Sequence, residues 1–144
     1  MGNDRPVSPD GELLLFDLVG AEVESIVFVR DYLQVTLYLP ESSPRLTCYA
    51  WPAVTPPGSA ARSLGDAGYR DALCALIGRR VAGASAGSKT GLILHFDADT
   101  SLTIRPAWPE LTGPEIAMLH MNDPSQRWKV WRPGEPPFES DPSP

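Results

Sequence analysis

The sequence predicts an α+β fold, mainly antiparallel β-sheet, built from two related helix-and-meander units and a C-terminal hairpin. The first observation behind this prediction is an internal repeat: the motif Gly-x-x-Val that starts at Gly20 returns at Gly78, 58 residues later. The second is that each copy leads into an alternating apolar segment and a Leu-Thr pair, and closes on Trp-Pro at Trp51 and Trp108. Because a three-stranded meander buries only one face, we expect each unit to cover the other.

The length and composition fit one soluble domain. The chain has 144 residues, of which 42% are hydrophobic and 21% are charged, and this is enough for a single core. We expect the domain at residues 11–132, with a first unit at 13–52, a second unit at 71–109 and the hairpin at 115–132. The polar, proline-containing ends, residues 1–10 and 133–144, are expected to be disordered tails.

Each unit is expected to begin with a helix. The clearer helix runs from about Asp66 to Ile77, because its apolar residues recur at helical spacing and Gly78 can end it in a left-handed conformation. The apolar stripe is Tyr69, Leu73, Leu76 and Ile77. The corresponding segment of the first unit, Leu13–Val19, could be a short helix or a buried strand, and its match to the second unit favours the helix.

The remaining alternating segments predict strands. The first unit has them at Val23–Val29, Leu33–Leu39 and Arg45–Trp51, and the second at Arg80–Ala86, Leu92–Phe96 and Ser101–Arg105. Between the units, Pro52–Arg62 contains three prolines and a glycine and is expected to be a connector. The hairpin strands are expected at Glu115–Met121 and Arg127–Trp131, although residues 116–119 could instead form a helical turn after Pro114.

Charge and cysteine content restrict the class of function. The net charge is −6, which disfavours a nucleic-acid binder or a protein that docks on anionic membranes. No apolar stretch is long enough to span a membrane and the N-terminus has no signal-peptide character, so a cytoplasmic location is expected.

The two cysteines, Cys48 and Cys74, are too few for a disulfide framework, and both are expected to be buried free thiols.

Three segments resemble small bacterial domains, mostly from actinobacteria, that are built around Gly-x-x-Val meanders and are uncharacterised. They are Leu76-Ile77-Gly78-x-x-Val81, Leu92-x-Leu94-x-Phe96 and Trp128-x-Val130-Trp131-x-Pro133-Gly134-Glu135. The resemblance extends over about residues 13–138. It implies a β-rich fold of unknown role, and it transfers no catalytic residue.

The residues that could carry chemistry have structural explanations. His95 and His120, with Asp97, Asp99 or Glu115 nearby, could in principle hold a metal, but they lack metal-ligand spacing. Asp97-Ala98-Asp99 lies where a hairpin must turn. The segment Gly83–Gly91 lacks the residue order of a phosphate-binding loop, and neither cysteine has a partner motif. No catalytic residue, cofactor or metal is therefore expected.

The tryptophans are the candidate interaction residues. Trp128 and Trp131 lie three apart on one strand and so face opposite sides, which leaves one exposed unless both faces are covered; the alternative is that all four tryptophans cover the core. The candidate surface comprises Trp51, Trp108, Trp128, Trp131 and His95.

These residues predict a non-catalytic protein-interaction module. Its acidity could suit an immunity or antitoxin-like protein that masks a basic toxin surface. The alternative is a small-molecule binder or enzyme, with a pocket between the two units lined by Trp51, Trp108 and His95. Homodimerisation through the last strand is a third possibility.

Overall fold

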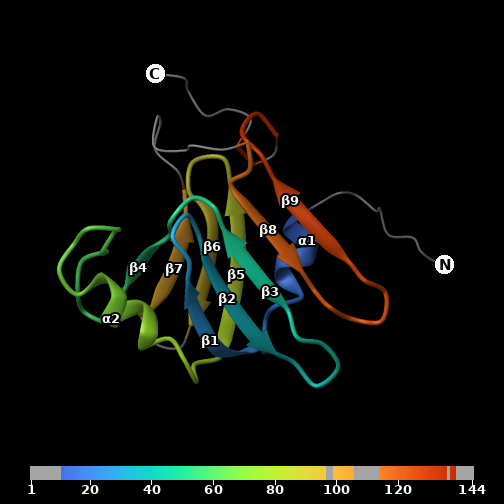
Figure 1. Cartoon of the computed structure of the whole chain (residues 1–144), viewed down its shortest axis with the longest axis horizontal. Helices are drawn as coiled ribbons and strands as arrows, with labels where there is room; N and C mark the ends of the chain where they lie inside the picture. The colour runs from blue at the N-terminus through green and yellow to red at the C-terminus, as the bar shows by residue number, and fades with distance from the viewer. Residues whose placement is uncertain (1–10, 97–98, 106–113, 136, 139–144) are drawn as a thin grey trace.

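The computed structural model describes residues 11–96, 99–105, 114–135 and 137–138. Two antiparallel sheets pack with their inner faces on one shared hydrophobic core, and two short helices lie at their sides (Figure 1). The predicted α+β class with a predominance of antiparallel sheet is confirmed. Among the described residues, no helix is long and apolar enough to cross a membrane.

The first sheet has five strands in the order β1-β2-β3-β8-β9, and the second has four in the order β4-β7-β6-β5. The strands of the first sheet are β1 (Glu22–Phe28), β2 (Leu33–Tyr38), β3 (Arg45–Cys48), β8 (Ala117–His120) and β9 (Trp128–Trp131). Those of the second are β4 (Ala53–Thr55), β5 (Val81–Gly87), β6 (Gly91–Phe96) and β7 (Ser101–Ile104). The hairpin of β8 and β9 thus extends the first sheet beyond β3, as expected.

The two units exchange a strand. After β3 the chain crosses to the second sheet, where β4 pairs with β7, and after β7 it crosses back, where β8 pairs with β3. Helix α1 (Gly11–Phe16) contacts β5 and β9, and α2 (Tyr69–Cys74) contacts β4 and β1. Each helix therefore packs against one edge strand of each sheet, and the buried leucines of both helices join the common core.

Hydrogen bonds between the units are reciprocal. The amide of Gly20 donates to the carbonyl of Val81 at 2.8 Å, and the amide of Gly78 donates to the carbonyl of Val23 at 2.8 Å. The register shifts directly after Val23 in β1 and directly after Val81 in β5, so both first strands carry a bulge at the same place. Both glycines have a positive φ, 95° for Gly20 and 92° for Gly78, a conformation that favours glycine at the end of a helical segment.

The helical interpretation of Leu13–Val19 is confirmed by α1 as far as Phe16, where the helix ends and turns follow, and the alternative strand is excluded. The second helix is shorter than predicted, because α2 ends at Cys74 and the chain continues in turns to Gly78. Ile77 therefore leaves the helical phase and is 48% exposed, whereas the rest of the predicted stripe is buried. Predicting Ile77 on the buried face was wrong for this reason.

Three other expectations need correction. The connector Pro52–Arg62 contains β4, whose Val54 is fully buried opposite Leu102. The third strand stops at Cys48 rather than Trp51, because the next two amides both donate to the carbonyl of Ile116. Phe138 belongs to the core and is 2% exposed, so the domain extends beyond residue 132.

The alternative interpretation of residues 116–119, a helical turn, is excluded because β8 occupies most of that segment.

Candidate interaction surface

A row of side chains crosses the outer face of the first sheet. Register places Ser25, Thr36, Arg45, His120 and Trp128 opposite one another, one on each strand. Residues directly opposite across strands share a face of the sheet. The neighbouring residues in β2, β3 and β8 alternate with this row and are buried in the core, so the row faces away from the core.

The row ends at an exposed tryptophan. Trp128 is 59% exposed, Arg45 is exposed and His120 is half-buried between them. We call these three side chains, together with the outer backbone edge of β9, the β9 surface. Trp131, three residues further on the same strand, is 1% exposed, which confirms that the two tryptophans face opposite sides.

The outer edge of β9 carries unpaired backbone groups. The amide of Met121 donates to the carbonyl of Arg127 at 2.9 Å. In an antiparallel ladder such hydrogen-bonded pairs alternate with non-bonded pairs, so the backbone groups of Trp128 and Val130 point away from β8. Within the described part of the chain, no backbone hydrogen bond reaches these outward groups.

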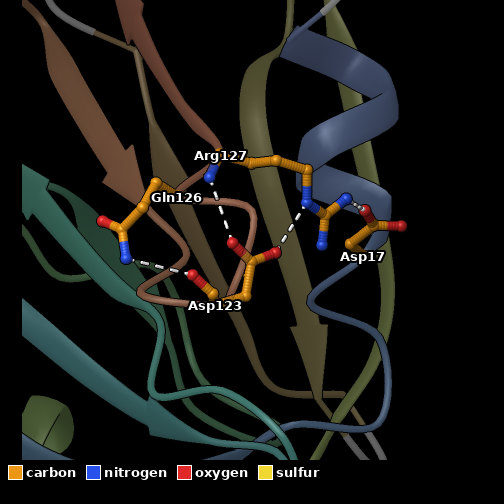
Figure 2. A network of polar contacts seen from close by, with 4 residues as sticks. All are labelled: Asp17, Asp123, Gln126 and Arg127. Carbon is orange, nitrogen blue, oxygen red and sulfur yellow. Dashed lines mark hydrogen bonds and ion pairs between the residues drawn. The ribbon is translucent and has the colours of Figure 1, made fainter.

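A buried carboxylate holds the turn between β8 and β9 (Figure 2). Asp123 is 8% exposed and accepts the backbone N–H of Arg127 at 3.1 Å and its Nε–H at 2.7 Å. The side chain of Gln126 donates to the Asp123 carbonyl at 3.1 Å. Arg127 also forms an ion pair with Asp17, which follows α1. This network joins the turn to the N-terminal helical segment and fixes the start of β9.

The same contacts set the ionisation of the carboxylate. Burial alone would raise the pKa of Asp123, but the hydrogen bonds and positive charge of Arg127 outweigh burial and hold that pKa below its ordinary value. The paired carboxylate in turn raises the pKa of the Arg127 guanidinium. Both groups are therefore charged at neutral pH, and the ion pair is intact.

A second set of contacts anchors the other side of the turn. His120 Nδ1 lies 3.1 Å from Asn122 Oδ1, and Asn122 Nδ2 donates to the carbonyl of Ser43 at 2.9 Å. Asn122 and Gln126 both have a φ of 54°, which few residues other than glycine adopt. The turn is thus connected to the β2–β3 turn as well as to α1, and the side chain of His120 is oriented beside Trp128.

The local charge of this surface differs from that of the whole chain. Residues 127–132 contain Arg127, Lys129 and Arg132 and no acidic residue, in a chain whose net charge is −6. Arg127 is neutralised by Asp123 and Asp17. Within the described residues, Lys129, Arg132 and Arg45 form no ion pair. Cations therefore border the edge of β9, although Lys129 faces the side of Trp131 and Leu119 and not the side of Trp128.

The structure does not bring the predicted interaction residues together. Trp128 is exposed, but Trp131 is buried in the core, so its assignment to an interaction surface was wrong. Trp51 packs partly buried against the core. His95 is exposed on the outer face of the second sheet, on the opposite side from the β9 surface. Trp108 lies outside the described residues.

The position of His95 bears on two other expectations. Its side chain points away from the core, so it cannot line a cavity between the sheets beside Trp51. His95 and His120 lie on opposite outer faces and cannot bind one ion together. In the described residues, no three His, Cys, Asp or Glu side chains are placed to hold a metal. Of the Asp97-Ala98-Asp99 segment, only Asp99 is among these residues.

The two cysteines differ in environment. Cys48 is fully buried as expected, and burial raises the pKa of its thiol to about 12. Cys74 is exposed, which contradicts the expectation that both thiols are buried. The reason is that Cys74 ends α2 on the side away from its buried residues, Tyr69 and Leu73.

Sequence reasoning missed Arg45 and the Asp17–Asp123–Arg127 network. An aspartate followed four residues later by an arginine is a local signal that could have indicated the Asp123–Arg127 contact. No local signal exists for the contact between Arg127 and Asp17, which are 110 residues apart. No protein-family model, curated protein or solved structure matches this chain.

Proposed function

We propose that this protein is a non-catalytic protein-interaction module that binds its partner through the β9 surface. The observation that carries the proposal is Trp128, a 59% exposed tryptophan on an edge strand. Exposed tryptophans are costly in isolation and are enriched among the residues that dominate binding energy. Covering roughly 150 Å² of this side chain would contribute about 3 kcal/mol.

The rigid setting of Trp128 supports this role. The residue next to it, Arg127, is fixed by Asp123 and Asp17, and its cross-strand neighbour His120 contacts Asn122. A surface that is ordered before binding loses less conformational entropy when the partner arrives. The contacts of the turn therefore favour a surface built to present an aromatic side chain.

The ionisable groups of the described residues also favour binding over catalysis. The raised pKa values of Cys48 and Tyr69 come mainly from burial, and the Tyr69 hydroxyl donates to the carbonyl of Pro52. A raised thiol pKa makes Cys48 a weaker nucleophile at neutral pH. The lowered pKa of Asp123 is explained by its structural contact with Arg127. These groups support the fold and need no reaction to account for them.

Two narrower proposals accompany this one. The reciprocal hydrogen bonds of Gly20 and Gly78 and the matching bulges support an origin of the two units by duplication. An immunity or antitoxin-like role in the cytoplasm is one form that such a module could take. The cations that border β9 fit an acidic target at this edge, and not the basic toxin surface that the net charge of the whole chain suggests.

Peptide display tests the proposal without a known partner. The purified full chain is panned against a random library of unstructured peptides of about twelve residues, a length that spans an edge strand. Enriched peptides are then measured on the wild type, on Trp128→Ala and on Ile77→Ala, the last as a control because Ile77 is also an exposed apolar residue but follows α2.

We expect Trp128→Ala to weaken the enriched peptides about 30-fold, since loss of a dominant aromatic contact costs about 2 kcal/mol. Ile77→Ala should change their affinity less than about twofold. Circular dichroism spectra that match the wild type would show that both variants are folded. No enrichment, or enriched peptides that bind Trp128→Ala and the wild type equally well, would refute the proposal.

A further inference from the structure

We infer that the partner of the β9 surface is an extended acidic segment of another protein, which adds to β9 as a new edge strand of the first sheet. This inference rests on the proposed function. Strand addition to a free sheet edge is a common mode of peptide recognition, in which backbone hydrogen bonds supply affinity and side chains supply specificity.

The two sheets have four edge strands, β1, β9, β4 and β5, and their outer sides differ in backbone pairing. The start of β1 is hydrogen-bonded to Gly78 and Arg79, and the start of β5 to Gly20 and Ala21. The outer edge of β4 is occupied as well: the amide of Val54 donates to the carbonyl of Arg62 at 3.0 Å, and the reverse bond is 2.8 Å long. The later residues of β1 and β5 have no outward backbone partner in the described part of the molecule, but β9 is the one edge strand that has none anywhere along its outer side.

The edge of β9 has the geometry that an incoming strand requires. The outward backbone groups of Trp128 and Val130 are about 6.8 Å apart, the two-residue repeat of an antiparallel strand. An extended backbone can therefore pair with both residues at once. The side chain of Trp128 rises from the outer face at this edge, next to the position of an incoming strand, and could pack on its apolar residues.

The charges beside the edge of β9 determine which kind of strand it would accept. Lys129 and Arg132 border the edge without an ion-pair partner among the described residues, and Arg45 lies two strands away on the outer face. A second copy of the chain paired on β9 would bring its own Lys129 and Arg132 against these cations. Like charges on neighbouring strands are destabilising, whereas carboxylates at the same places would be attracted. The charge pattern therefore disfavours a homodimer through β9 and favours an acidic strand.

The test uses the full chain and two synthetic probes. One probe is a fluorescently labelled peptide of about ten residues in which valine and glutamate alternate, and the other has glutamine in place of every glutamate. Affinities are measured by fluorescence anisotropy for the wild type, Trp128→Ala, Lys129→Glu and Lys89→Glu. Lys89→Glu is the matched control, because it changes the net charge equally at the exposed turn between β5 and β6.

We expect the glutamate peptide to bind at least about tenfold more tightly than the glutamine peptide and to weaken at about 0.3 M salt. Lys129→Glu should weaken it about tenfold or more and Lys89→Glu less than about twofold. Trp128→Ala should weaken both peptides. Equal binding of the two peptides, no binding of either, or equal effects of the two lysine variants would overturn the inference.

Failure of this inference can be distinguished from failure of the proposed function. If the peptides selected by display depend on Trp128 but show no preference for acidic residues, the interaction module stands and the acidic partner is refuted. Sedimentation equilibrium tests whether a second copy of this chain occupies the edge of β9 instead. A dimer that becomes monomeric on Val130→Pro, a substitution that removes one outward amide of β9, would place a second copy at this edge and overturn the inference.

Discussion

The contact between Asp123 and Arg127 can be tested by Asp123→Asn. Asparagine has nearly the same shape and keeps an oxygen that can accept the backbone N–H of Arg127, now 3.1 Å from Asp123 Oδ1. It removes the charged acceptor at Oδ2, which lies 2.7 Å from Arg127 Nε. The substitution therefore isolates one charge-assisted hydrogen bond of the turn that carries Trp128.

The expected loss follows from the exposure of the two partners. A hydrogen bond to a charged group contributes about 1.5 to 3 kcal/mol. The side chain of Asp123 is 10% exposed, which favours a strong bond, but that of Arg127 is 45% exposed and it keeps its contact with Asp17. We therefore expect Asp123→Asn to lower the free energy of unfolding by about 1.5 kcal/mol at neutral pH, near the lower limit.

Urea denaturation at several pH values provides the measurement. The pKa of Asp123 in the folded protein lies below its ordinary value of 3.8, so the contribution of the carboxylate is fully present above that value and is lost as the pH falls through the folded pKa. Asparagine does not titrate. The difference between wild type and variant should therefore be largest at neutral pH and should decrease below about pH 4.

The control is Asp17→Asn, which removes the other partner of Arg127. Both side chains of that ion pair are more than 40% exposed, so its loss should cost less than about 1 kcal/mol. The reasoning is refuted if Asp123→Asn is no more destabilising than Asp17→Asn at neutral pH, or if its effect is the same at pH 3 and at pH 7.

The remaining predictions concern burial and backbone conformation. A thiol reagent should modify Cys74 in the native protein and Cys48 only after unfolding, and rapid native labelling of both would contradict the burial of Cys48. Gly91→Ala should lower the free energy of unfolding by more than about 3 kcal/mol, because the new Cβ would lie 2.3 Å from the carbonyl oxygen of Ile104, the last residue of β7. Gly78→Ala should lower it by only about 1 kcal/mol, because the new Cβ would meet open space. Thermal or urea unfolding measures both variants. Trp131→Ala should lower the free energy of unfolding by about 3 to 5 kcal/mol, because it removes a large buried side chain. A loss below about 1 kcal/mol in the same assay would show that Trp131 does not lie in a packed core.

Local patterns in the sequence determined much of the secondary structure. Alternation of apolar and polar residues located the middle strand of each predicted meander, β2 and β6, and the faces that they bury. The spacing of Trp128 and Trp131 placed them on opposite sides of β9, and the apolar spacing located both helices. These features depend on the repeat of the backbone itself, which is two residues in a strand and about 3.6 in a helix.

Tertiary structure alone decided which strands pair and which strands lie at the edges of the sheets. β3 pairs with β8, which follows it by about seventy residues, and Val54 is buried because the connector supplies a strand to the second sheet. The contact of Arg127 with Asp17 likewise joins residues far apart in the sequence. Periodicity specifies which face of a strand is apolar but not which neighbour covers it, because partners are selected by packing and register over the whole fold. For the same reason, only the assembled sheet shows that Trp128 lies on an edge strand whose outer side, among the described residues, has no backbone partner and is bordered by cations without an ion pair.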